Sequence, residues 1–307
     1  MTALIANMER LEHVVLTDRG QVSEIMGVDL PHELYDRSKK QQRSNTWQFF
    51  LVLACGLSAS GRSLKTLAMY NLNALDLGAF ASTKHAFIGI TKLSLSISDN
   101  SLILRDQTTL QTRSLTDLLE HAAPGLQFLS LNFNWQHHRA HTWHPPSLGA
   151  VFARPAPTTP TGIPLVFPRL LELKFRLFSM DTLALTTFLR HQPVLREATF
   201  DAVLLSGPGS TWNDVASALP HSATSWQVRN VSQPKRNRAD QCYTWNPLVE
   251  ILDSASGWEW DMADFLRQHQ LNATTMTQLS ADRLTYLKSR RRFSTIKFTR
   301  AARIAEV

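Results

Sequence analysis

Leu126-Gln127-Phe128-Leu129-Ser130-Leu131 carries leucine at its first, fourth and sixth positions. The same apolar spacing begins again at six other residues, namely Leu11, Leu64, Ile90, Leu170, Leu195 and Ala223. Residues two apart in a strand point to one face, so the last two apolar residues of each hexamer are predicted to point inward together. The intervening polar residues, such as Ser130, are predicted to point outward.

Intervals of 26, 25 and 28 residues separate positions 64 from 90, 170 from 195 and 195 from 223. These intervals suit one strand–turn–helix unit of a leucine-rich repeat, and the longer intervals require an insertion or a degenerate unit. Apolar stripes at helical spacing follow several hexamers. They predict helices over residues 47–57, 115–122, 182–191, 211–219 and 261–268.

Proline stands just after three of these helices, at Pro124, Pro193 and Pro220, where a helix commonly ends. Ser114 is the predicted N-cap of the helix at 115–122. The order helix, proline, strand predicts an α/β fold with parallel strands. We therefore predict an irregular leucine-rich-repeat-like solenoid, with strands on its concave face and helices on its convex face.

A regular leucine-rich repeat has Asn or Cys three residues after the last apolar position of the strand. Only Asn134 meets this rule here, and the equivalent residues elsewhere, such as Arg19 and Ser98, do not. We therefore expect unequal repeats whose turns are held by packing rather than by a side-chain hydrogen-bond ladder.

The predicted solenoid covers residues 1–245. Within it, residues 135–164 hold six of the 14 prolines and four histidines, and are predicted to be a mobile insertion. Residues 246–287 are predicted to be a helical cap and residues 288–307 a basic, helix-prone tail.

Charge and cysteine content limit the possible functions. The net charge of +7 is concentrated in residues 235–238 and 288–300, while the rest of the chain is closer to neutral. The two cysteines, Cys55 and Cys242, cannot form a disulfide framework, so we expect reduced thiols in the cytoplasm or nucleus. No apolar run approaches the roughly 20 residues needed to span a bilayer, and no signal peptide is evident, so no membrane partner is expected.

Residues 167–220 begin with Phe167-Pro-Arg-Leu-Leu-Glu-Leu-Lys-Phe175, continue through Phe188-Leu-Arg-His-Gln-Pro-Val-Leu195 and include Gly209-Ser-Thr-Trp212. This series is similar to the leucine-rich-repeat-like region of filamentous-fungal F-box-type proteins, and the weaker likeness extends over residues 1–232. The resemblance implies a substrate receptor of a cullin–RING ubiquitin ligase, in which the repeats bind the target.

The resemblance also implies an F-box that binds a Skp-type adaptor. Leu30-Pro31-His32-Glu33-Leu34 matches the opening of an F-box, but residues 35–44 are too polar for the apolar helices that should follow. We therefore expect the F-box to be missing from this chain. A Skp-type adaptor is expected as a partner only if an F-box lies upstream.

The sequence thus predicts a non-enzymatic protein-binding scaffold without a cofactor, whose protein partner the sequence does not identify. We expect no catalytic residue and no metal ligand. The predicted contacts are polar residues at or beside outward strand positions. They are Gln127, Ser130, Asn132, Arg169, Glu172, Lys174, Arg176, Glu197, Thr199, Asp201, Gln227 and Arg229.

Two alternatives remain open. His137, His138, His141 and His144 have the spacing of metal ligands, which would suit a metal-binding protein or a metal-dependent enzyme. Two prolines follow at once and no acidic general base is adjacent, so a solvated loop is the favoured interpretation. The basic tail mixes cations with Phe293 and Phe298, which is a pattern of nucleic-acid-associated proteins, but charge runs more often form solvated tails.

Overall fold

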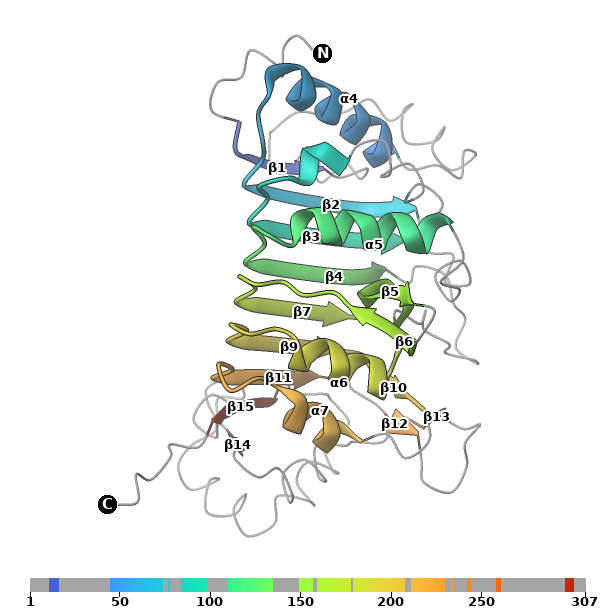
Figure 1. Cartoon of the computed structure of the whole chain (residues 1–307), viewed down its shortest axis with the longest axis vertical. Helices are drawn as coiled ribbons and strands as arrows, with labels where there is room; N and C mark the ends of the chain where they lie inside the picture. The colour runs from blue at the N-terminus through green and yellow to red at the C-terminus, as the bar shows by residue number, and fades with distance from the viewer. Residues whose placement is uncertain are drawn as a thin grey trace, which may run out of the picture.

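The computed structural model describes residues 11–16, 45–73, 77, 84–98, 110–134, 149–156, 159–177, 179–207, 211–229, 233–234, 242–243, 258–260 and 296–300. Within these ranges the chain is a mixed α/β protein built on a nine-stranded, mostly parallel sheet (Figure 1). The predicted α/β class with parallel strands is confirmed.

Seven parallel strands lie side by side in chain order (Figure 1). They are β1 (His13–Leu16), β2 (Thr66–Asn73), β3 (Lys92–Ser98), β4 (Phe128–Asn134), β7 (Glu172–Arg176), β9 (Glu197–Asp201) and β11 (Ser225–Arg229). Two further strands complete the sheet. β15 (Ile296–Arg300) pairs antiparallel with β11 and with β14 (Trp258–Trp260).

The helices lie on one face of this sheet (Figure 1). They are α4 (Asn45–Ser60), α5 (Leu110–Ala122), α6 (Thr182–Arg190), α7 (Trp212–Ala218) and the 3-10 turns η2 (Lys84–Phe87) and η4 (Gly149–Phe152). Three small two-stranded sheets accompany them. These are β5 (Ala153–Ala156) with β6 (Thr159–Pro164), β8 (Ser179–Asp181) with β10 (Leu204–Ser206), and β12 (Gln233–Pro234) with β13 (Cys242–Tyr243).

The apolar hexamer positions form two continuous rows across the parallel strands. The register aligns Val14, Leu67, Leu93, Leu129, Leu173, Ala198 and Trp226 in the first row, and Leu16, Met69, Leu95, Leu131, Phe175, Phe200 and Val228 in the second. From β2 to β11 these side chains are at most 1% exposed, and they share one core with the apolar faces of the helices. Each fully buried large apolar side chain stabilises the fold by about 1.5–3 kcal/mol.

A main-chain carbonyl just before each of the first six parallel strands accepts hydrogen bonds from the start of the neighbouring strand. The carbonyls of Glu12, Lys65, Thr91, Gln127, Leu171 and Arg196 each accept hydrogen bonds from two successive N–H groups at the start of the following strand, at 2.8–3.2 Å. We call this series the carbonyl ladder. The backbone thus supplies a ladder at the start of the strands that needs no particular side chain, in addition to the packing expected to hold the turns after them.

The turns after β7 and β9 are also held by the backbone. Leu177 and Ala202 adopt positive φ angles of 61° and 52°. Their N–H groups donate to the carbonyls of Asp201 and Arg229, at 2.9 and 2.7 Å. The left-handed conformation costs a residue with a Cβ about 1–3 kcal/mol, so these hydrogen bonds and the neighbouring packing hold two strained residues in place.

Part of the proline-rich segment 135–164 belongs to the core, contrary to the predicted mobile insertion. Val151 and Phe152 are 0% and 1% exposed, and the Phe152 ring lies 4.6 Å from the ring of Phe188. Gly162 permits the β5–β6 hairpin, because it has φ 72° and a Cβ there would lie 2.3 Å from the Arg154 carbonyl. Burial of these apolar residues therefore fixes part of the segment in the fold despite its high proline content.

The helices at 47–57, 115–122, 182–191 and 211–219 are confirmed as α4, α5, α6 and α7, whereas residues 261–268 lie outside the described ranges. α5 begins at Leu110, so Ser114 is a buried residue inside the helix and not its N-cap. Residues 296–300 of the predicted helix-prone tail form β15, because Phe298 buries its ring 4.7 Å from that of Trp226.

The buried side chain of Gln192 links the end of α6 to residues 165–167, which follow the β5–β6 hairpin. Its Nε2 donates to the carbonyls of Leu165 and Phe188, and its Oε1 accepts from the N–H of Phe167. Gln192→Met keeps the side-chain length but removes the partner of the Leu165 carbonyl and of the Phe167 N–H, whereas the Phe188 carbonyl still accepts from the His191 N–H. The change should lower the free energy of unfolding by about 2–4 kcal/mol in urea titration. Gln127→Met, at an exposed site, is the control. Equal stability of both variants would contradict the role of Gln192.

Ala202 offers a test of the strained turn after β9. Ala202→Gly removes the Cβ that disfavours its positive φ, and should raise the free energy of unfolding by about 0.5–1 kcal/mol after the added chain entropy is subtracted. The matched change Ala216→Gly, inside α7, should lower it by about 1 kcal/mol or more. Destabilisation by both glycines would show that Ala202 is not strained.

Candidate functional site

Strand residues that alternate with the two buried rows point to the face opposite the helices, which we call the outward face. The register orders them into three rows. The first holds His13, Thr66, Lys92, Phe128, Glu172, Glu197 and Ser225; the second holds Val15, Ala68, Ser94, Ser130, Lys174, Thr199 and Gln227; the third holds Ser96, Asn132, Arg176, Asp201 and Arg229. Most of the outward side chains on β7, β9 and β11 are therefore charged or polar, whereas most of those on β2 and β3 are short.

Ten of the twelve predicted contact residues lie in these rows. Glu172 and Glu197 are in the first; Ser130, Lys174, Thr199 and Gln227 are in the second; Asn132, Arg176, Asp201 and Arg229 are in the third. Gln127 is exposed just before β4, and Arg169 is exposed in the turn before β7, outside the rows. The structure thus brings all but these two into one registered array.

Sequence reasoning missed Thr66, Lys92 and Phe128 in the first row. Each stands at the third position of its hexamer, as Glu172 and Glu197 do in theirs. The same spacing rule could therefore have found them. The contacts selected from the sequence were polar residues and so left out Phe128, whose side chain is half-buried on the outward face.

Ion pairs connect the charged residues of β7 with their neighbours. Lys174 lies 2.7 Å from Glu172 and its ammonium stands 5.1 Å from the centre of the Phe128 ring. The Arg176 Nε lies 3.2 Å from an Asp201 carboxylate oxygen on the next strand. Exposed pairs of this kind contribute about 0.2–1 kcal/mol each, so their main effect is to orient the side chains.

Two charged residues of the first row, Lys92 and Glu197, are exposed and make no ion pair with any residue that the structure describes. At the β1 edge, by contrast, Lys65 pairs with Glu12 at 2.6 Å, and its hydrogen bond lowers the pKa of the Glu12 carboxyl. Within the first row, charges without an ion partner among the described residues therefore lie on β3 and β9, on either side of Phe128 and Glu172.

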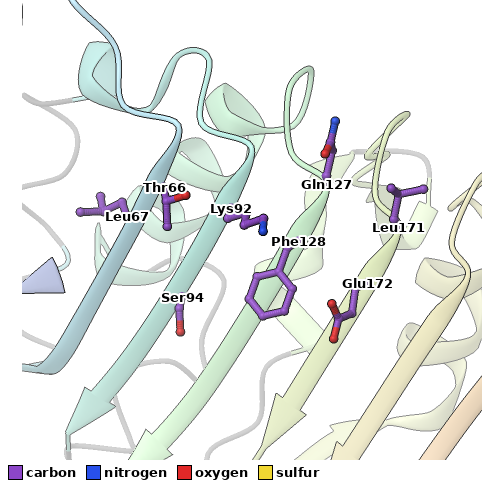
Figure 2. Close-up of a pocket in the computed structure, with 8 residues that line it drawn as sticks. All are labelled: Thr66, Leu67, Lys92, Ser94, Gln127, Phe128, Leu171 and Glu172. Carbon is purple, nitrogen blue, oxygen red and sulfur yellow. The ribbon is translucent and has the colours of Figure 1, made fainter. Parts of the chain in front are cut away.

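A groove of about 460 Å³ crosses the strands on the outward face (Figure 2). We call it the Phe128 groove. It is lined by Thr66, Leu67, Lys92, Ser94, Gln127, Phe128, Leu171 and Glu172. Figure 2 shows the Phe128 ring between Lys92 and Glu172, with the short side chains of Thr66 and Ser94 toward β2.

The described ranges contain no group of three or more His, Cys, Asp or Glu side chains that could hold a metal ion. His137, His138, His141 and His144 lie outside these ranges, so the metal alternative stays a prediction. Among the described helices, none has the length and apolar character needed to cross a membrane.

Comparison with protein-family models, with curated proteins and with solved structures found no match for this chain. The outward face presents hydrogen-bonding groups and charges of both signs on a registered sheet.

Proposed function

We propose that this chain is a non-enzymatic protein-binding scaffold, folded as an irregular leucine-rich-repeat-like solenoid that binds its partner on the outward face. Three features support the solenoid. The parallel strands follow chain order, the helices gather on one face, and the hexamer spacing recurs with each strand. Stacked units of this kind form extended surfaces that bind other macromolecules.

One observation carries the proposal: the two faces of the sheet have opposite chemistry. The inward rows are committed to the core, whereas the outward rows present amides, hydroxyls and paired charges. Adjacent strands are about 4.8 Å apart, so a row of seven residues spans about 29 Å. That length suits the surface of another folded protein better than a small molecule.

The mixture of charges favours a protein partner over nucleic acid. Glu172, Glu197 and Asp201 interleave with Lys174 and Arg176 on the outward face. Carboxylates repel a phosphate backbone, whose binding depends on clustered cations. Charges of both signs instead allow complementary pairing with a protein surface and the rejection of wrong partners.

The similarity of residues 167–220 to fungal F-box-type proteins supports a narrower proposal, that this scaffold recognises targets for a cullin–RING ubiquitin ligase in the cytoplasm or nucleus. Proximity labelling with the full chain tests it. Enrichment of cullin and Skp-type adaptor peptides is the expected result. Their absence, with other partners labelled, would leave a binding scaffold without a ligase role.

Charge reversal tests the outward face as the binding surface. The double change Lys174→Glu with Arg176→Glu should reduce partner capture at least fivefold in quantitative pull-downs, because it inverts the two cations at the centre of the face. Both side chains are about half exposed, so the loss of their two ion pairs should lower the thermal midpoint only slightly.

The matched control is Arg113→Glu with Arg190→Glu, which reverses two exposed cations on the helices α5 and α6. This control should keep the wild-type partner profile. If the Lys174/Arg176 variant captures the same partners in the same amounts as the control, the outward face is not the binding surface.

A further inference from the structure

Charge is distributed unevenly along the first row of the outward face. Lys92 stands on β3, Phe128 on β4, Glu172 on β7 and Glu197 on β9, in one register. A cation, an aromatic ring and two carboxylates therefore follow one another across four strands. The stretch of the row from Lys92 to Glu197 therefore has a positive end, an apolar centre and a negative end.

Both ends have charge available for a partner. Lys92 pairs with no carboxylate that the structure describes, and the same holds for Glu197 and the described cations. Glu172 is already paired with Lys174, so the added negative character at that end comes mainly from Glu197. An oppositely charged side chain at each end would gain a pair without breaking one.

The centre of the row has both space and an apolar surface. The Phe128 groove provides about 460 Å³ beside the half-buried Phe128 ring. Lys174 occupies one side of that ring at 5.1 Å, while the ring also borders the groove between Lys92 and Glu172 (Figure 2). An aromatic ring at the edge of a groove is a typical anchor for an apolar side chain.

We propose that the Phe128 groove binds an extended segment of a partner protein in which an acidic residue is followed by an apolar residue and then by a basic residue. This inference rests on the proposed function of the outward face and deepens it by naming the chemistry of the partner. The acidic residue pairs with Lys92 and the apolar residue packs on Phe128, both in the groove. The basic residue pairs with Glu197 on β9, one strand beyond Glu172 at the end of the groove.

Strand spacing sets the length of the segment. Three steps of about 4.8 Å separate β3 from β9, which gives about 14 Å. An extended chain advances about 3.3 Å per residue, so the acidic and basic residues should stand about four positions apart, with the apolar residue between them. The groove crosses the strands, and the segment therefore lies across them too.

Selection from a phage-displayed library of random dodecapeptides on the full chain tests this inference. The wild-type chain should enrich peptides with an acidic residue, an apolar residue and a basic residue in this order and spacing. Lys92→Glu should remove the acidic preference alone, and Glu197→Lys should remove the basic preference alone. In fluorescence titrations, each change should weaken binding of a selected peptide about tenfold.

Arg113→Glu is the control for a charge reversal away from the groove and should leave the selected motif unchanged. Two results would overturn the inference: no enrichment of the stated motif, or the same motif selected by wild type, Lys92→Glu and Glu197→Lys. Peptide binding that is lost with the Lys174/Arg176 double variant but kept by the groove variants would place the contact elsewhere on the outward face. That outcome overturns the groove inference and leaves the proposed function standing.

Discussion

The carbonyl ladder is the interaction on which the rest of this structure depends. At six successive junctions one carbonyl accepts two N–H groups from the start of the next parallel strand. These bonds set where each strand begins relative to its neighbour. A slip of one residue would exchange the inward and outward side chains of a whole strand, so the ladder protects the core and the outward face together.

The ladder also explains how unequal repeats stay in register. Successive strands begin 25 residues apart between 172 and 197 but 53 residues apart between 13 and 66. The connections differ in length, yet each brings the next strand to the carbonyl just before the preceding parallel strand. Since the ladder uses the backbone, residues as different as Glu12, Thr91 and Leu171 serve it equally. The asparagine expected in a regular repeat is not required for that purpose.

Much of the architecture could be predicted from the sequence, because the hexamer combines strand alternation with burial. Apolar stripes at helical spacing predicted four of the observed helices, and the order helix, proline, strand predicted parallel strands. The prediction failed where apolar residues stood among polar or proline-rich neighbours. Val151 and Phe152 pack in the core. Phe298 is buried too, and the basic segment around it forms the strand β15. In the candidate site, Lys92 and Phe128 obeyed the spacing rule but became evident only when the register placed them in one row with Glu172.

Native-state amide hydrogen exchange tests the central claim most directly, because it reports on the ladder at each strand. The N–H groups of Thr66, Lys92, Phe128, Glu172 and Glu197 all donate to ladder carbonyls. We predict that these five amides exchange slowly and with similar opening free energies, as one cooperative sheet. Exchange at the rates of an unstructured peptide, or opening free energies that differ widely among the five, would contradict a shared register and the outward face built on it.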